Sequence, residues 1–168
     1  MNQLFAGRYT AVTDEPFVVF LIGMRINKFH LVHKWLPVAH AMGPMLQTLN
    51  EYPEKGFLSG HGYFGGRVTL LVQYWRSFED LEAFARNPSD PHLDAWKKFN
   101  KAVGTSGTVG IWHETYKVRA NEHESVYGNM PRFGLATAFD HAPVTRHNNS
   151  ARKRINPEKE KELETAVS

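Results

Sequence analysis

The sequence of 168 residues contains no cysteine. This absence excludes disulfide bonds, thiolate nucleophiles and cysteine-ligated zinc or iron–sulfur sites. A cysteine-free chain is compatible with a reducing compartment, and we expect a cytoplasmic location.

Long apolar runs are missing as well. The longest run, FVVFLIGM at residues 17–24, is too short to cross a bilayer, which takes about 20 residues. It lies downstream of charged residues, without the basic leader and cleavage site of a signal peptide. We therefore expect a soluble protein with no membrane partner.

A strong charge imbalance is absent from most of the chain. The formal net charge is +3, but the residues from His141 onward contain six Lys/Arg against four Asp/Glu. The first 140 residues are therefore close to neutral and show no basic stripe with interleaved aromatic residues, so we expect no nucleic-acid partner. The Walker loop, GxGxxG, GxSxG, HExxH and EF-hand patterns are also absent, which argues against the common nucleotide-binding, hydrolase and metal-site classes.

The residues that are present describe one globular domain followed by a tail. A hydrophobic content of 42% and an aromatic content of 12% are typical of a folded protein of this length. From about His141 the sequence has few large apolar residues and cannot bury enough surface to offset its ordering entropy. We expect a domain over residues 1–140 and a flexible or marginally helical tail over residues 141–168.

Hydrophobic periodicity predicts strands and helices in a regular order. Residues 17–27 are rich in β-branched and aromatic residues, as strands are. Gly65 and Gly66 stand between two strand-like runs, which is a strong hairpin signal. The predicted elements are strand 17–27, helix 34–50 with a kink at Gly43-Pro44, strands 57–64 and 67–75, a helix opening at Ser77, a second helical piece capped by Asp90 and ending near Gly104, and strand 110–118.

This order, β-α-β-β-α-β, is that of an α+β protein with the ferredoxin-like fold. It places one antiparallel sheet against two helices and leaves the other face of the sheet to be covered. A second copy of the sheet commonly covers that face in this fold, so we expect a homodimer.

The strand GIWHETYKV, residues 110–118, carries candidate reactive residues. Alternation points His113 to one face and Trp112, Glu114 and Tyr116 to the other, so His113 and Glu114 cannot form a direct acid–base couple. His113 is either a hydrogen-bonded structural residue or a base. Glu114 either pairs with Arg25 or has a raised pKa and acts in catalysis.

Two further histidines are candidates. His61 shares a strand face with Phe57, Ser59 and Tyr63, while Gly60 and Gly62 leave a gap on the other face that fits either close backbone packing or a ligand. His92 lies in the first turn of a helix, where the dipole disfavours its protonation, and it is either a surface residue or a neutral metal or haem ligand.

Several long strings resemble one family. The chain is similar over about residues 5–140 to small proteins related to the monooxygenase of the fumagillin pathway, within the antibiotic-biosynthesis-monooxygenase-like dimeric α/β barrels. The strings that carry the resemblance are GRYTA (7–11), VVFLIGMRIN (18–27), KWLPV (34–38), QYWRSFEDLEAFAR (73–86), HLDAWKKFN (92–100), GIWHETY (110–116) and NMPRFGL (129–135).

The resemblance implies a ferredoxin-like homodimer with a pocket between sheet and helices, in which a small hydrophobic, polyketide- or terpenoid-like substrate is oxygenated. Our first hypothesis is a monooxygenase without a cofactor, in which a base forms a substrate carbanion that reduces dioxygen. The hypothesis gives catalytic roles to His113, Glu114 and Tyr116, and substrate-binding roles to Arg25, His61, Tyr74, Trp75, Trp96 and Trp112.

Two alternatives remain open. The same superfamily includes haem proteins, either haem-degrading or similar to aldoxime dehydratases, and here the axial ligand would be His113, His61 or His92. The third possibility is a non-catalytic protein that binds a small ligand, because a fold does not determine a function.

Overall fold

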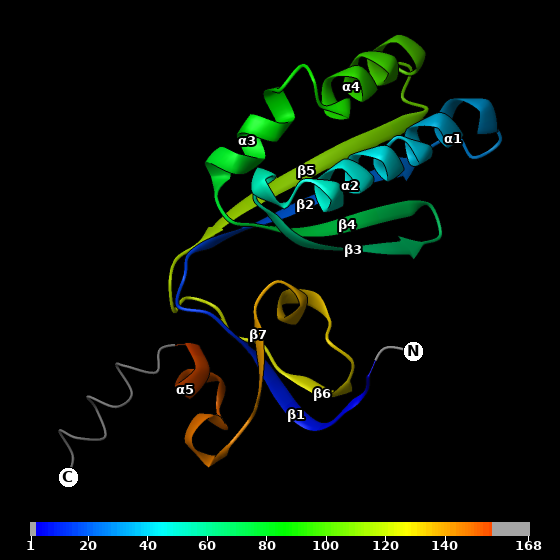
Figure 1. Ribbon diagram of the computed structural model, residues 1–168. Coiled ribbons are helices and arrows are strands. Elements are labelled where there is room, and N and C mark those ends of the chain that lie inside the picture. The colour runs from blue at the N-terminus through cyan, green and yellow to red at the C-terminus, as the bar shows by residue number, and fades with distance from the viewer. Residues whose placement is uncertain (1–2, 156–168) are drawn as a thin grey trace. The chain divides into compact units, whose positions relative to one another are not determined.

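The computed structural model describes residues 3–155, without the side chains of residues 91, 92, 94, 95, 98 and 102. Contacts divide the chain into two compact units (Figure 1). The central unit is Val18–Tyr116, and the terminal unit combines Met1–Phe17 with Lys117–Ser168. The described residues include no helix that is both apolar and long enough to span a bilayer. The expected cytoplasmic location stays a prediction.

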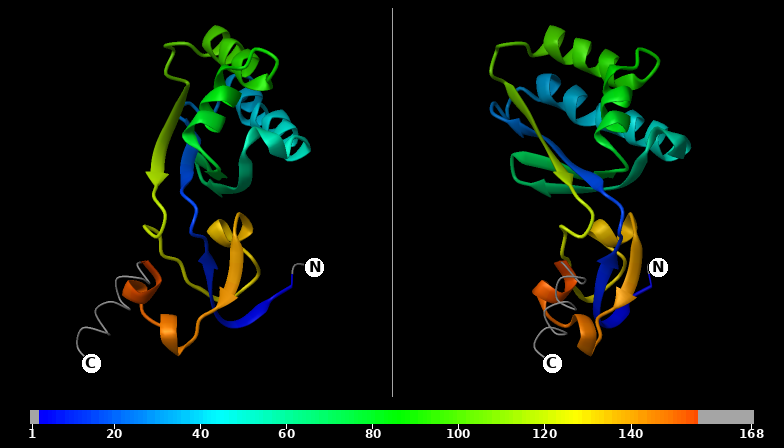
Figure 2. Two further views of the ribbon diagram at one scale, coloured as in Figure 1. Left: turned by 60° about the vertical axis from the view of Figure 1, so that its left-hand side comes forward. Right: turned by 90° about the vertical axis from the view of Figure 1, so that its left-hand side faces the viewer.

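The central unit has the ferredoxin-like fold, as predicted. Its sheet has the strand order β3-β4-β2-β5. Its elements follow one another as β-α-β-β-α-β, and each of the two helical segments is divided into two helices. Figures 1 and 2 show the four helices on one side of this sheet. The elements are β2 (Phe17–Ile26), α1 (Val32–His40), α2 (Met42–Glu51), the 3-10 turn η1 (Pro53–Lys55), β3 (Phe57–Gly65), β4 (Val68–Trp75), α3 (Phe78–Arg86), α4 (Pro91–Ala102) and β5 (Val109–Val118).

The two faces of this sheet differ because side chains alternate along each strand. Val18 and Trp75 are cross-strand partners, and both pack in a core cluster with residues of α2 and α3. Met24, Ile26 and Val109 form a second cluster with Trp35 and Val38 of α1. We call the side that carries the helices the helix face and the opposite side the open face.

The first helical segment is divided into two helices, α1 and α2, rather than kinked. α1 ends at His40 and α2 begins at Met42, so the break precedes the expected kink at Gly43-Pro44 by two residues. Pro44 has no backbone N–H to donate to the carbonyl of His40, which is the point where α1 stops.

The helix starts follow the prediction in α3 but not in α4. Ser77 Oγ accepts a hydrogen bond from Asp80 N at 3.0 Å and caps α3. Asp90 occupies the N-cap position of α4 but forms no cap hydrogen bond. Its carboxylate lies 2.9 Å from Lys55 Nζ instead, because the ion pair competes for the same oxygens.

The predicted hairpin is present, with one correction. Gly66 has a φ of +56°, as the tight turn between β3 and β4 requires. A register shift between Phe57 and Ser59 turns Phe57 to the helix face, so Phe57 does not share the face of His61. Its ring covers Gly60, where an added Cβ would lie 3.0 Å from Phe57 Cζ, and so fills part of the expected gap.

The terminal unit contains a sheet that the sequence analysis missed in part. Its strand order is β6-β1-β7, and both pairs are antiparallel. The run ESVYGNMPRFGLATAF after the strand at 110–118 predicts one further short strand, in the region of β6, but the sequence does not predict β1 and β7. The elements are β1 (Phe5–Val12), β6 (Tyr127–Met130), the 3-10 turn η2 (Gly134–Thr137), β7 (Asp140–Pro143), the 3-10 turn η3 (Arg146–Asn148) and α5 (Ala151–Ile155).

The segment after residue 140 differs from the flexible tail that we expected. His141 lies in β7, stacks on Tyr9 at a ring distance of 4.6 Å and meets the edge of Phe5 at 4.8 Å. The expectation of a flexible tail considered only large apolar residues and left histidine out. The ring of His141 nevertheless supplies the packing contacts between β7 and β1. The boundary at residue 140 stays a prediction, and residues 156–168 of the expected tail lie outside the described residues.

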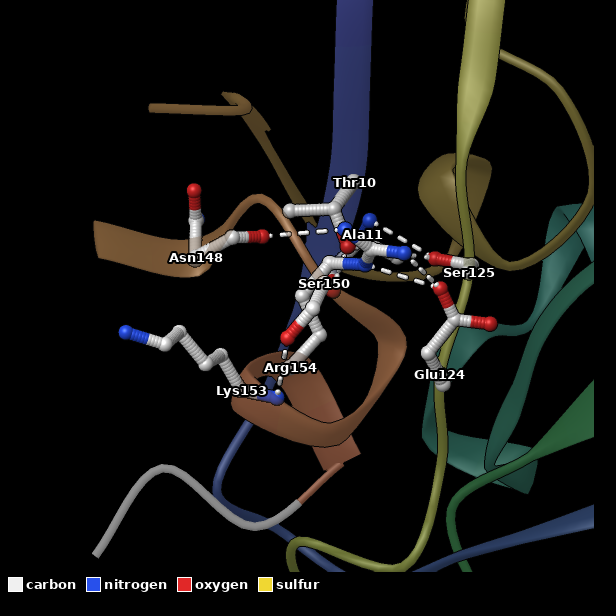
Figure 3. Close-up of polar contacts among 8 residues, drawn as sticks. All are labelled: Thr10, Ala11, Glu124, Ser125, Asn148, Ser150, Lys153 and Arg154. Carbon is white, nitrogen blue, oxygen red and sulfur yellow. Dashed lines mark hydrogen bonds and ion pairs between the residues drawn. The ribbon is translucent and has the colours of Figure 1, made fainter. Parts of the chain in front are cut away.

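A polar network holds α5 within the terminal unit (Figure 3). Arg154 Nε donates to Glu124 Oε1 at 2.8 Å, and Arg154 Nη1 donates to the carbonyl of Asn148 at 2.9 Å. Next to Glu124, Ser125 Oγ accepts a hydrogen bond from Ala11 N at 2.9 Å. The loop before β6 therefore contacts both β1 and α5.

The histidines of the terminal unit predict a pH-dependent stability. Burial lowers the pKa of His123 despite a hydrogen bond to the backbone of Ala11, and burial together with the charge of Arg132 lowers the pKa of His141. The unfolded chain therefore takes up protons first, near a pH of about 6.5, and the free energy of unfolding should be full above that pH and fall as the pH decreases.

Urea unfolding at pH 7.5, 6.5 and 5.5 measures this dependence. His141→Phe should flatten it, whereas His147→Phe, at an exposed position, should not. An unchanged slope in His141→Phe would contradict the assignment.

Candidate active site

An apolar cavity lies between the sheet and the helices of the central unit. Its volume is about 40 Å³. Among the described residues, Gln73 and the indole N–H of Trp75 supply the polar groups of its wall. The lining residues are Phe20 and Ile22 of β2, Met42, Met45 and Leu49 of α2, Gln73 and Trp75 of β4, and Leu81, Phe84 and Ala85 of α3. We call it the helix-face cavity.

Gln73 and Trp75 form a buried polar pair in the wall of this cavity. Gln73 is 4% exposed and Trp75 is 0% exposed. Trp75 Nε1 donates to Gln73 Oε1 at 2.8 Å. Because an indole nitrogen can only donate, this bond fixes the orientation of the Gln73 amide, whose NH₂ group is the remaining donor at the wall.

His113 lies next to the helix-face cavity but is itself exposed. It shares the helix face with Ile111, which packs in the second core cluster. Its ring lies 5.7 Å from the ring of Phe20, a lining residue. Of the candidate residues on β5, His113 is therefore the one on the helix face, although it is not among the residues that line the cavity.

The second half-site, Trp112, Glu114 and Tyr116, lies on the open face. Tyr116 Oη donates to Glu114 Oε2. This hydrogen bond and the negative charge of Glu114 raise the pKa of Tyr116, since the carboxylate opposes a phenolate beside it. The expected Arg25–Glu114 pair does not form: Arg25 donates to Asn27 Oδ1 instead.

The other predicted site residues are divided between locations. Of the predicted substrate-binding residues, only Trp75 lines the helix-face cavity. His61 and Tyr74 lie on the open face, opposite Val72 and Val19 of the neighbouring strands. Trp96 is half-exposed on α4 and stacks on Phe99 at 5.5 Å, away from the cavity wall. The side chain of His92 lies outside the described residues.

Gln73 and the methionines of α2 are site residues that the sequence analysis did not propose. Gln73 had a recognisable signal, because it stands between Leu71 and Trp75 on the buried side of TLLVQYW and a polar residue there needs a partner. Met42 and Met45 fall at helical spacing among the apolar residues of the predicted helix 34–50, and nothing in that spacing distinguishes a cavity wall from a filled core.

A second, larger cavity lies in the terminal unit. Its volume is about 440 Å³, and charged side chains stand at its wall. The lining residues are Val12, Thr13, Asp14, Arg132, Thr137, Ala138, Phe139 and Asp140. Its charged wall does not suit a hydrophobic substrate, so the smaller helix-face cavity is the candidate active site.

Comparison with known proteins identifies the family. The model of the family described as Monooxygenase af470-like matches residues 17–135. The chain belongs to the Monooxygenase af470-like family. A curated relative, Monooxygenase af470 of Aspergillus fumigatus, is 29% identical over 122 residues, which are 67% of this chain and 42% of that protein. This member of the family thus spans less than half the length of the relative that it matches.

Solved structures support the fold of this Monooxygenase af470-like protein. An aldoxime dehydratase in complex with butyraldoxime superposes with a TM-score of 0.61 and 16% identity, over 83% of this chain and 41% of that one. SnoaB, a cofactor-independent oxygenase from Streptomyces nogalater, superposes with a TM-score of 0.45 and 9% identity, over 61% of this chain and 93% of that one. The first likeness shows a shared fold; the second is too low to carry an argument.

The described residues do not form a haem pocket on the helix face. His113 and His61, two of the three candidate axial ligands, lie on opposite faces of the sheet, so at most one of them could ligate the iron of a given site within a subunit. The helix-face cavity, which His113 does not line, measures about 40 Å³, so neither a haem nor the body of a substrate fits it unless the surrounding side chains move. Among the described residues there is also no group of three or more His, Asp or Glu side chains that could hold a metal ion.

The close approach of Trp112 to Gly23 predicts that position 23 requires glycine. An added Cβ at Gly23 would lie 2.8 Å from Trp112 Nε1 and 2.5 Å from the carbonyl oxygen of Thr69. Gly23→Ala should therefore destabilise the protein by about 1–3 kcal/mol in urea unfolding, as overpacking does. Gly128→Ala, whose Cβ would meet nothing within 4 Å, is the matched control and should change little. Equal stability of the two variants would show that Trp112 does not occupy this position.

Proposed function

We propose that this protein is a monooxygenase that acts on a small hydrophobic substrate at the helix-face cavity. The observation that carries the proposal is an apolar cavity with one polar pair, Gln73 and Trp75, in a chain of a monooxygenase-named family. Apolar walls with a few oriented polar groups are typical of sites for hydrophobic ligands. The family resemblance of the whole domain and the aldoxime dehydratase fold are consistent with an enzyme of this type.

His113 is the base of the proposed reaction. A neutral imidazole accepts a proton near neutral pH, and His113 borders the cavity through Phe20. It removes a proton from an activated CH₂ group of the substrate, and the carbanion reduces dioxygen. One oxygen atom enters the substrate as a carbonyl, and the other leaves as water with the two hydrogens of the CH₂ group. This balance requires no external reductant, so we propose that no cofactor takes part.

Substrate binding requires the cavity to enlarge. A volume of about 40 Å³ holds a few molecules of the size of water, at roughly 10–15 Å³ each. It therefore accommodates dioxygen or the reacting edge of a substrate, but not the body of one. Met42 and Met45 of α2 line it, and methionine side chains adapt readily because three bonds rotate. We propose that these two side chains move when the substrate enters.

The open face is the proposed contact of a homodimer. It presents half-buried apolar side chains from three adjacent strands, with no helix over them in the central unit. A sheet face of this kind needs a cover, and the sheet of a second copy is the simplest one. The apolar residues are Val19 and Leu21 of β2, Leu70 and Val72 of β4, and Trp112 of β5. Glu114, Tyr116, His61 and Tyr74 would then lie at this contact, and their proposed roles would depend on the second copy.

The role of His113 can be tested with anthrone, a carbon acid with one activated CH₂ group. Oxygen uptake by the wild-type protein should exceed the uncatalysed rate, and His113→Ala should lower kcat about 10²–10⁴-fold, the usual contribution of a general base. His147→Ala, at an exposed position of the terminal unit, is the control and should retain full activity. Full activity of His113→Ala would remove His113 from the mechanism.

The dimer is tested by the molar mass in solution. Wild-type protein should sediment as a dimer, and Leu21→Glu on the open face should sediment as a monomer, because a charge in that contact loses its hydration. Leu36→Glu, on the exposed side of α1, should leave the dimer intact. Circular dichroism must show that both variants are folded. A folded Leu21→Glu dimer would place the contact elsewhere.

A further inference from the structure

Three loops meet at one end of the central unit. They connect β2 to α1 (residues 27–31), β3 to β4 (66–67) and α4 to β5 (103–108), and Figures 1 and 2 show them at the same end of the sheet. Arg67 Nη1 donates to the carbonyl of Asn27 at 3.1 Å, and Asn27 N donates to the carbonyl of Thr108 at 3.0 Å. These bonds join the three loops into one surface, which we call the loop end.

Large apolar side chains protrude from the loop end. Phe64, next to the turn of the hairpin, is 86% exposed, and Phe29 and Val32 are 49% and 45% exposed. Phe29 is held in place by the ring of Trp35, at 5.6 Å, and Trp35 Nε1 donates to its carbonyl at 2.9 Å. Exposed large apolar side chains that gather at one end of a unit are typical of a surface that meets a partner.

The charge of the loop end has one sign. The sequence contains no Asp or Glu in residues 16–50, 55–78 and 95–113, the three segments that supply its loops. Lys28 and Arg67 lie in the loops, and Lys101 lies in the last turn of α4. Lys28 Nζ donates to the carbonyl of Ser106 at 3.4 Å and Arg67 to that of Asn27, so both cations contact neutral oxygens.

The acidic residues of the central unit gather elsewhere, mainly on the end of α2, on η1 and on α3. There they form ion pairs with other cations: Asp80 pairs with Arg76 at 2.9 Å, and Glu82 pairs with Arg86 at 2.9 Å. The positive charge of the loop end is therefore not compensated locally.

We propose that the loop end binds the surface of a membrane that contains anionic lipid. Phe29, Phe64 and Val32 enter the interfacial layer, where aromatic and aliphatic side chains are stabilised, and the cations contact lipid headgroups. An acidic protein surface would match the charge but would leave Phe64, which projects from a turn, without a complementary pocket. A lipid interface accommodates separate protruding side chains without any matching shape.

Binding at the loop end would attach the protein to one leaflet of the membrane, and it does not depend on the proposed oxygenase activity. It revises the expectation of no membrane partner, which rested on the absence of a spanning segment. The linear sequence does not show which loops come together in the fold, so it could not reveal a surface patch formed by three separate loops.

Flotation of the full-length protein with lipid vesicles tests the proposal. The protein should float with vesicles of phosphatidylcholine and phosphatidylserine at a 70:30 ratio in 0.1 M NaCl, and should not float with phosphatidylcholine alone or in 0.5 M NaCl. Lys28→Gln/Arg67→Gln should weaken partitioning roughly 30-fold, from about a factor of five for each cation at an anionic surface. Arg86→Gln/Arg119→Gln, which removes two exposed charges elsewhere, should partition as the wild type does.

The depth of Phe64 is tested with a fluorophore. Because the chain has no cysteine, Phe64→Cys gives a single site for an environment-sensitive label. Its emission should increase and shift to shorter wavelength on anionic vesicles, whereas the label on Leu4→Cys, an exposed apolar position of the terminal unit, should not respond.

Three results would overturn the proposal. They are flotation that does not depend on phosphatidylserine, equal loss of flotation in both charge-removal variants, and a label at position 64 that stays in water while the protein floats. If Lys28→Gln/Arg67→Gln instead changes the sedimentation of the protein without vesicles, the loop end binds another copy of this chain and the lipid proposal is wrong.

Discussion

The burial of Trp75 is the constraint on which the central unit depends. Its ring packs against Phe57 of β3 at 5.5 Å and Phe84 of α3 at 5.8 Å, and so joins α3 to the two strands of the hairpin. Truncation of a buried tryptophan typically costs about 3–5 kcal/mol. The indole also carries an N–H that must be satisfied inside the protein, and Gln73 is the partner. The same requirement that stabilises the core therefore places a polar group at the wall of the apolar cavity.

Two-residue alternation explains why residues adjacent in sequence serve different surfaces. His113 borders the cavity through Phe20, while its neighbours Trp112 and Glu114 lie on the open face. One strand thus contributes both to the interior of a subunit and to the surface on which an assembly would form. A substitution at position 113 therefore changes the helix face, whereas a substitution at position 112 or 114 changes the open face.

The sequence was informative where the signal was local. The strands of the central unit follow from β-branched runs, the hairpin from Gly65 and Gly66, and the start of α3 from Ser77. Prediction from the sequence failed where an element is stabilised by residues that are distant in the chain. β7 forms because His141 packs against rings of β1, and Asp90 leaves its cap because Lys55 lies close by. Of the site residues that the sequence predicts, Trp75 lines the cavity, whereas Gln73 and the faces of Arg25 and Tyr74 required the register of the strands. The roles of Trp75 and His113 stay predictions.

The sheet of the terminal unit is assembled from both ends of the chain. β1 comes from residues 5–12, and its two neighbours, β6 and β7, come from residues 127–143. During synthesis β1 therefore leaves the ribosome more than a hundred residues before β6 and β7. Until then its backbone N–H and C=O groups have no strand partner. Closing so long a loop is entropically unfavourable until the intervening residues have folded. Folding of the central unit shortens the effective loop between β1 and its partners, and removal of β1 or of residues 127–143 takes strands from the same sheet.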